Sequence, residues 1–164
     1  MGAPYLLYSG LLIEHKTPGE LRSELEAISH AAEICVRHSL RLLYHHHWWE
    51  IVDDFADLRF YLARTDPELV SFCLDLGWVY RAGGDPMQAM DLCAGRAPYF
   101  HLRDDTPAKR WTGLGQGVIN FPTLLAEMKE RKAEWAVVEQ DDITGSVTEA
   151  LRASRNFLRE AAGI

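Results

Sequence analysis

The sequence predicts an α/β fold with a parallel sheet, built from about five β-α units. Short, nearly continuous apolar runs alternate with longer amphipathic stretches, a pattern typical of parallel strands covered by helices. The amphipathic stretches begin at clear helix-capping signals. No linker or low-complexity segment interrupts this alternation, so we expect a single domain over residues 1–164.

Five short apolar runs are predicted to be the strands. They are residues 5–8, 40–44, 69–74, 98–100 and 135–138. Each is separated from the next by a stretch that is long enough to return the chain as a helix, as a parallel sheet requires.

Five helices are predicted from the signals at their starts. Residues 17–20 (Thr-Pro-Gly-Glu) form a capping box with proline at the first helical position. Residues 85–88 repeat the proline signal, and residues 146–149 repeat the capping box. Asn120 is the predicted N-cap of a fourth helix, and the remaining helix covers about residues 51–63.

Composition narrows the class of protein. Charged residues make up 25% and aromatic residues 10% of the chain, which excludes disordered, collagen-like and coiled-coil proteins. The net charge of −7 and the lack of a basic block argue against nucleic acid or a membrane surface as a partner. No apolar run is long enough to span a bilayer. Three cysteines without a C-x-x-C pair are expected to be reduced thiols, which favours a cytoplasmic protein.

Residues with catalytic or metal-binding chemistry follow four of the predicted strands. The second strand runs into His45-His46-His47-Trp48-Trp49-Glu50, and the next three end at Asp75, His101 and Glu139. Successive members lie about one β-α repeat apart, so each occupies an equivalent position on its strand. Because ligands bind at the carboxyl edge of parallel sheets, we expect these side chains to converge. A mixed nitrogen and oxygen set of this kind suits Mn²⁺, Co²⁺, Zn²⁺ or Fe²⁺.

Each of these residues also has a structural interpretation. A lone Asp or His at a strand end is more often a loop cap or a solvated residue, although four in register are harder to explain in that way. Alternation along the strand places His45 and His47 on one face and His46 on the other, among the helices. Asp104 and Asp105 are equally well explained as a solvated loop pair.

Several short motifs follow one another in a characteristic order. They are Tyr44-His45-His46-His47-Trp48-x-Glu50, Thr65-Asp66-Pro67, Asp75-Leu76-Gly77-Trp78, Ala82-Gly83-Gly84-Asp85-Pro86, Gly95-Arg96, His101-Leu102-Arg103-Asp104, residues 113–117 and residues 135–141. As a set they resemble the sugar phosphate isomerase/epimerase family, which has the xylose isomerase-like (β/α)₈ barrel and includes inosose dehydratases and ketose epimerases. The resemblance runs from about Gly2 to the C-terminus. It implies a partial TIM barrel of about five β-α units that corresponds to the C-terminal five-eighths of the family's barrel.

The resemblance implies a metal site. Three residues match the family's metal-binding Asp, His and Glu on its sixth, seventh and eighth strands: Asp75, His101 and Glu139. Many members complete the site with a Glu on the fifth strand, where this chain carries His45-x-His47, as in a subgroup with a His-Asn-His motif. We expect His47 to be the fourth ligand, with His45 and Glu50 as alternatives.

The resemblance also implies a sugar as the small-molecule substrate. Trp78 stands where some relatives have a substrate-binding His, and is expected to form an aromatic wall against a sugar face. His45, Arg103 and Asp104 are the other expected substrate-binding residues. Gln116 replaces a frequent Glu, so no acid role is assigned to it.

The expected chemistry is metal-dependent isomerisation or epimerisation of a keto-sugar through an enediolate. A divalent ion (Mn²⁺, Co²⁺, Zn²⁺ or Mg²⁺) is the expected cofactor, and Glu139, His47 and Glu50 are the expected catalytic residues. Loss of a β-hydroxyl would instead give dehydration, so a keto-sugar or inosose dehydratase or lyase is the alternative.

A hypothesis of another class is a non-catalytic partial barrel. A complete (β/α)₈ barrel takes about 250 residues, and a five-stranded part of it leaves open edges. Because open strand edges invite pairing with a second chain, we expect a homo-oligomer. The related apurinic endonucleases are disfavoured, since they need a basic DNA-binding face.

Overall fold

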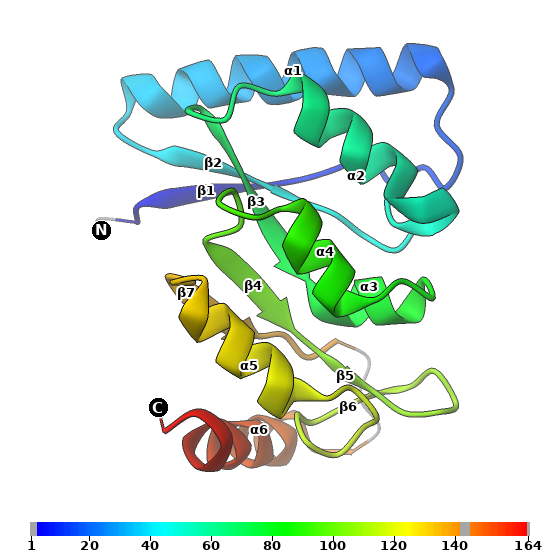
Figure 1. Ribbon diagram of the computed structural model, residues 1–164, viewed down its shortest axis with the longest axis vertical. Coiled ribbons are helices and arrows are strands. Elements are labelled where there is room, and N and C mark those ends of the chain that lie inside the picture. The colour runs from blue at the N-terminus through cyan, green and yellow to red at the C-terminus, as the bar shows by residue number, and fades with distance from the viewer. Residues whose placement is uncertain (1–2, 142–144, 164) are drawn as a thin grey trace.

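The computed structural model describes residues 3–141 and 145–163, and its centre is a parallel five-stranded sheet (Figure 1). In spatial order the strands are β1 (Tyr5–Ser9), β2 (Arg41–His45), β3 (Val70–Asp75), β4 (Tyr99–Leu102) and β7 (Trp135–Val138). Each strand pairs in parallel with its neighbour in this order. All five predicted strands are present. The arrangement confirms a partial barrel of the TIM type with five β-α units.

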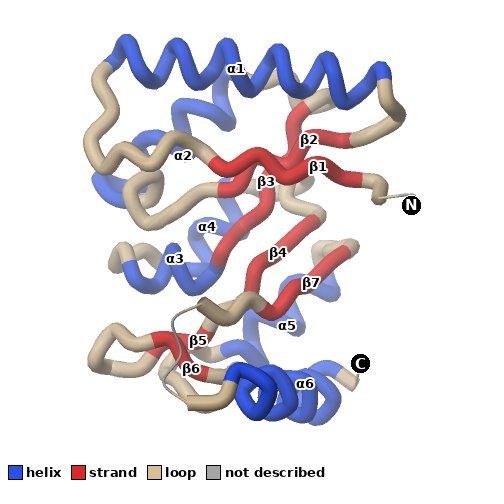
Figure 2. Tube along the Cα trace, turned by 180° about the vertical axis from the view of Figure 1, so that it is seen from behind, coloured by secondary structure: helices blue, strands red, loops and turns tan. Residues whose placement is uncertain are grey.

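Four of the five predicted helices begin at the predicted capping residues, Thr17, Asp85, Asn120 and Ser146, whereas the helix predicted over about residues 51–63 begins after Ile51 without a side-chain cap. In α1 (Pro18–Arg37), the Thr17 side chain accepts from the Glu20 backbone and the Glu20 carboxylate accepts from the Thr17 backbone. The other helices are α2 (Val52–Arg64), α4 (Pro86–Leu92), α5 (Phe121–Glu130) and α6 (Val147–Ala162). Helices α2, α4 and α5 cover one face of the sheet, and Figure 2 shows the opposite face.

Two features were not predicted. The six-residue helix α3 (Leu76–Arg81) begins directly at the end of β3, where the Asp75 carboxylate accepts from the Trp78 backbone at 2.9 Å. The strands β5 (Asp104–Asp105) and β6 (Trp111–Thr112) form a short antiparallel pair after β4. Elements of six and two residues are too short to show a hydrophobic period, which explains why the sequence pattern did not reveal them.

The core fills the space between the sheet and its helices. Its largest completely buried side chains include Tyr44, Tyr61, Phe72, Phe100 and Phe121. Within the described residues, no helix is long and apolar enough to cross a membrane.

Side chains at the amino-terminal end of the sheet draw its two edge strands together. The Tyr5 hydroxyl on β1 donates to the Glu134 carboxylate just before β7, and Arg41 lies 3.3 Å from the same carboxylate. The rings of Tyr5 and Tyr99 meet edge to face at 6.0 Å. The sheet is therefore strongly curled. β1 and β7 are the edge strands of the sheet. The homo-oligomer was expected to form by pairing at such edges, and it stays a prediction.

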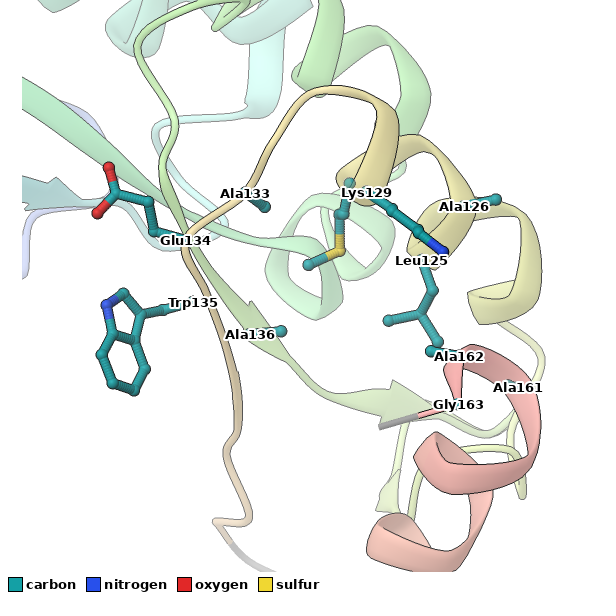
Figure 3. A pocket seen from close by; sticks show the side chains of 11 residues that line it. Leu125, Ala126, Lys129, Ala133, Glu134, Trp135, Ala136, Ala161, Ala162 and Gly163 are labelled. Atoms are coloured by element: carbon teal, nitrogen blue, oxygen red, sulfur yellow. The ribbon is translucent and has the colours of Figure 1, made fainter.

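A cavity of about 610 Å³ lies beside β7, between α5 and α6 (Figure 3). Its lining is mostly apolar, with Leu125, Met128 and Trp135 as its largest side chains and Lys129 and Glu134 as its charged ones. None of the histidines or acids at the carboxyl edge of the sheet reaches this cavity. It is therefore separate from the candidate site.

Candidate metal centre

Four side chains converge at the carboxyl edge of the sheet. His45 ends β2, Asp75 ends β3, His101 lies near the end of β4, and Glu139 follows β7 directly. One potential ligand atom from each residue lies within 4.8 Å of the corresponding atoms of the other three. Asp75 and His101 are direct partners in the strand register. The parallel sheet thus brings together residues that are up to 94 positions apart in the numbering.

We call this group the quartet: His45, Asp75, His101 and Glu139. The distances between its members show side chains that point toward a common centre. Asp75 Oδ2 lies 3.6 Å from His45 Nε2 and 3.9 Å from His101 Nδ1. His101 Nδ1 lies 2.6 Å from Glu139 Oε2, in an orientation that does not align as a hydrogen bond. The other ring nitrogen of His45, Nδ1, is 3.5 Å from the Ser9 hydroxyl, which leaves Nε2 directed toward Asp75.

The donor atoms of the quartet fit a divalent metal ion. His45 Nε2, Asp75 Oδ2, His101 Nδ1 and Glu139 Oε2 are all buried and have no hydrogen-bond partner among the described residues. Charged contacts compensate part of this burial, since Asp75 Oδ2 lies 2.8 Å from Arg103 Nε and His101 Nδ1 lies 2.6 Å from Glu139 Oε2, but none of the four atoms makes a well-aligned hydrogen bond. Two imidazole nitrogens and two carboxylate oxygens are a donor set that Zn²⁺, Mn²⁺, Co²⁺ and Fe²⁺ accept.

Arg103 binds both carboxylates of the quartet. Its Nε lies 2.8 Å from Asp75 Oδ2 and its Nη2 lies 2.6 Å from Glu139 Oε1, while Nη1 pairs with Asp141. Burial alone would raise the pKa of Glu139, but His101 and the Arg103 charge outweigh it and lower the pKa to about 2. Glu139 is therefore a carboxylate at neutral pH. Arg103 holds the acidic side chains of the site in place, and its expected role in substrate binding stays a prediction.

His46 links two of the strand ends that carry the quartet. Its Nε2 accepts a hydrogen bond from the Asp75 backbone at 3.1 Å, and its Nδ1 lies 3.1 Å from the His47 carbonyl. Since a backbone N–H can only donate, Nε2 is the acceptor and Nδ1 carries the proton. Burial, followed by the nearby His45, lowers the pKa of His46 to about 3, so the ring is neutral. His46 is completely buried and turned away from the ligand atoms, as expected.

The structure brings His45, rather than His47, into the group of four converging side chains. His45, given as an alternative, joins the quartet, whereas His47 does not. The reason is that β2 ends at His45, so alternation no longer sets the direction of His47. The His47 ring stacks on Trp49 with 4.5 Å between centroids. Burial and His45 lower the pKa of His47 to about 4, which leaves a neutral imidazole beside the quartet.

Glu50, expected to be catalytic, is held at both of its carboxylate oxygens by other groups of the chain. Its side chain is completely buried, where Oε2 accepts from the His47 backbone at 2.7 Å and Oε1 accepts from Lys16 at 2.5 Å. These bonds occupy both carboxylate oxygens, and neither oxygen belongs to the quartet. Glu50 therefore fixes the loop that follows β2.

Trp78 lies beside the site, on the first turn of α3. Its ring is 6.1 Å from that of His47, and the Arg103 guanidinium lies 5.2 Å from its centroid. The indole N–H is buried without a partner among the described residues. These contacts place Trp78 where a substrate could meet it, and its role as an aromatic wall stays a prediction.

Asp104, expected to bind substrate, has its carboxylate occupied by the backbone of this chain. It is completely buried, and its two oxygens accept four backbone N–H groups, from Asp105, Gly115, Gly117 and Ile119, at 2.9 to 3.2 Å. A side chain at Gly117 would collide with this carboxylate. Nor is the pair solvated, because Asp105 is buried against Arg81. Asp104 therefore organises the loop that follows β6.

Replacing Asp104 with asparagine should destabilise the protein by about 2–4 kcal/mol, because one amide NH₂ would then face two backbone donors. Urea unfolding followed by circular dichroism measures this change. Asp91→Asn is the matched control, since Asp91 is an exposed partner of Arg131 and should change stability by less than about 1 kcal/mol. Equal effects of the two substitutions would contradict the assigned role of Asp104.

The chain is similar to proteins with the same architecture. The xylose isomerase-like TIM barrel family matches it over residues 1–161. Inosose dehydratase from Geobacillus kaustophilus (strain HTA426) is 28% identical over 148 residues, which cover 79% of this chain and 48% of that protein. Inosose dehydratase from Bacillus cereus (strain AH820) is 28% identical over 162 residues, 85% of this chain and 54% of that protein. The chain thus spans about half the length of these curated relatives.

Solved structures show the same fold. A sugar phosphate isomerase/epimerase from Parabacteroides distasonis ATCC 8503 superposes with a TM-score of 0.82 at 22% identity, over 98% of this chain and 61% of that one. The IolI protein, solved with a bound zinc atom, superposes with a TM-score of 0.79 at 15% identity, over 97% of this chain and 63% of that one. At such identities the likeness concerns the fold alone.

Proposed function

Because the chain belongs to the xylose isomerase-like TIM barrel family, we propose that it acts as a divalent-metal-dependent sugar isomerase or epimerase. The substrate class is a keto-sugar or a related polyol. The observation that carries this proposal is the quartet, in which two imidazoles and two carboxylates bring one buried potential ligand atom each to a common point.

The quartet would hold the ion. A divalent ion at this point supplies the positive charge that stabilises an enediolate when a proton leaves the carbon next to a carbonyl. Zn²⁺, Mn²⁺ and Co²⁺ suit the two imidazoles better than Mg²⁺, which prefers oxygen ligands and keeps its waters. A zinc atom bound in one structural neighbour supports a metal in this fold.

Proton transfer is assigned to Glu139 and His47. Glu139 is ionised, and its side chain is 31% exposed, whereas that of Asp75 is completely buried. Glu139 is thus the carboxylate of the quartet that a substrate can reach, and it is in the form that accepts a proton. The neutral His47 ring, whose Nδ1 has no hydrogen-bond partner among the described residues, offers a second group that can accept a proton.

Dehydration is the second candidate reaction. It begins with the same proton removal, after which a β-hydroxyl leaves instead of a proton being returned. Two observations favour it. The curated relatives described above are inosose dehydratases, and Glu139 is the single carboxylate of the quartet open to solvent, while an epimerase commonly uses an acid or base on each face.

Proton exchange in D₂O tests the proposal. We expect the protein loaded with Mn²⁺, Co²⁺ or Zn²⁺ to catalyse deuterium incorporation next to the carbonyl of a ketose or an inosose, as measured by NMR. Exchange with an isomeric product identifies an isomerase or epimerase, and loss of water identifies a dehydratase. If the metal-loaded protein exchanges no proton across a panel of ketoses and inososes, the non-catalytic hypothesis is correct and the proposal is wrong.

A further inference from the structure

A thiol lies next to the quartet, one step along the strands toward their amino-terminal ends. Cys73 precedes Asp75 by two residues on β3, so both side chains point to the same face of the sheet. In the strand register, Cys73 is the direct partner of His45 on one side and Tyr99 on the other. The thiol is completely buried. It therefore lies in the layer of side chains directly below the carboxylates.

The two histidines of the quartet also form a group with this thiol. One potential ligand atom each from His45, Cys73 and His101 lies within 4.8 Å of the other two. This group is distinct from the quartet, because Cys73 does not come within that distance of all four of its members. His45 Nε2 and His101 Nδ1 are buried without hydrogen-bond partners among the described residues, so each is available to only one ligand set at a time, that of the quartet or that of Cys73.

We propose that His45, Cys73 and His101 form a second metal site that selects thiophilic ions such as Cd²⁺ and excludes the ion of the quartet. A thiolate is a soft ligand, whereas the carboxylates of Asp75 and Glu139 prefer harder ions. Because the two sites share both imidazoles, one ion at a time occupies this edge of the sheet. A thiophilic ion would consequently inhibit the enzyme by moving the histidines from one ligand set to the other.

The binding step releases one proton. The Cys73 S–H bond breaks, the sulfur donates its electron pair to the metal, and the thiol proton passes to solvent, so that R–SH and Cd²⁺ give R–S–Cd⁺ and H⁺.

The chain supplies its own controls. Cys35 and Cys93 are also buried, but neither belongs to a group of potential metal ligands among the described residues. Cys93→Ser thus removes a buried thiol of the same kind without touching the proposed site. Cys73→Ser removes the soft ligand, but leaves all four members of the quartet in place.

The experiment is a Cd²⁺ titration of the wild type, Cys73→Ser and Cys93→Ser. Cadmium–thiolate charge-transfer absorption should grow to one equivalent in the wild type and in Cys93→Ser, and should be absent in Cys73→Ser. Loss of a hydrogen bond to a metal-binding side chain already costs about 10–100-fold in metal affinity, so loss of this direct ligand should weaken Cd²⁺ binding at least ~100-fold. In the wild type, Cd²⁺ should also displace Co²⁺, as followed by the visible spectrum of Co²⁺.

The inference rests on the proposed metal centre but not on the reaction proposed for it. The Cd²⁺ and Co²⁺ measurements therefore test the thiophilic site and the metal centre separately. Co²⁺ binding to Cys73→Ser with an unchanged visible spectrum would show that the variant is folded and that the quartet is intact. A cadmium–thiolate band that is absent from the wild type, or equally strong in Cys73→Ser, would overturn the thiophilic site alone. Failure of the wild type to bind Co²⁺ would overturn the metal centre and this inference together.

Discussion

Asp75→Asn should weaken divalent metal binding at least ~100-fold and reduce any metal-dependent turnover by a similar or larger factor. The substitution is nearly isosteric, and it separates the two functions of this side chain. Oδ1 accepts from the Trp78 backbone and caps α3, a role that the amide oxygen of asparagine retains. Oδ2 lies among His45, His101 and Arg103, where an amide nitrogen cannot bind a metal.

Isothermal titration with Zn²⁺ or Co²⁺ measures this effect directly, without a known substrate. Asp141→Asn is the matched control, because Asp141 also pairs with Arg103 but is half exposed and lies outside the quartet. It should bind the metal within several-fold of the wild type. Equal affinity of Asp75→Asn and the wild type, with circular dichroism showing both folded, would rule out the quartet as the metal site.

The features that the sequence predicts well are those that local rules determine. Apolar runs located all five strands, although only β3 is buried along its whole length and the edge strands β1 and β7 are partly exposed. Capping residues such as Thr17 and Ser146 located helix starts, since a cap is a contact across three residues. The shared edge followed from topology: parallel strands place Asp75, His101 and Glu139 together whatever lies between them.

The sequence was less informative where contacts between distant parts of the chain determine the position of a side chain. Choosing between His45 and His47 required the residue at which β2 ends, and strand ends are set by pairing with β1 and β3. The sequence around Asp104 did not reveal its role, because three of the four backbone N–H groups that its carboxylate accepts belong to residues more than ten positions away. Lys16 carried no signal at all, because it lies in an irregular segment and its partners lie on two other elements.

That lysine is the centre of a buried ionic cluster, formed by Lys16, Glu24, Glu50 and Asp57. Lys16 Nζ lies 2.5 Å from Glu50, 3.2 Å from Asp57 and 3.7 Å from Glu24. The side chains of Lys16, Glu24 and Glu50 are completely buried. Burial alone would lower the pKa of Lys16, but the three carboxylates outweigh it and raise the pKa, so the ammonium stays charged.

The cluster joins the segment after β1 to the loop that carries the histidines. Glu24 accepts from the Leu11 backbone at 2.7 Å and from the Tyr61 hydroxyl at 2.5 Å, which ties α1 to α2. Glu50 accepts from the His47 backbone. Through these bonds, one ammonium group holds two loops at the edge of the sheet where the quartet lies.

Lys16→Met should lower the free energy of unfolding by about 3–5 kcal/mol, because it keeps the volume of the side chain but leaves buried carboxylates without a cation. For a domain with a total stability of about 5–15 kcal/mol, this loss would be visible as a large shift of the urea midpoint. Arg59→Met is the control, since Arg59 forms an exposed pair with Asp54 and should cost about 0–1 kcal/mol.

The double variant Lys16→Met/Glu50→Gln tests the electrostatic origin of that loss. Glutamine retains an acceptor oxygen for the His47 backbone and removes one buried negative charge, so the double variant should be more stable than Lys16→Met alone. If the lysine contributes only packing, the second substitution will instead leave stability unchanged or lower it further. Urea unfolding of the wild type, both single variants and the double variant gives the coupling energy between the ammonium and the carboxylate, which we expect to be at least about 1 kcal/mol.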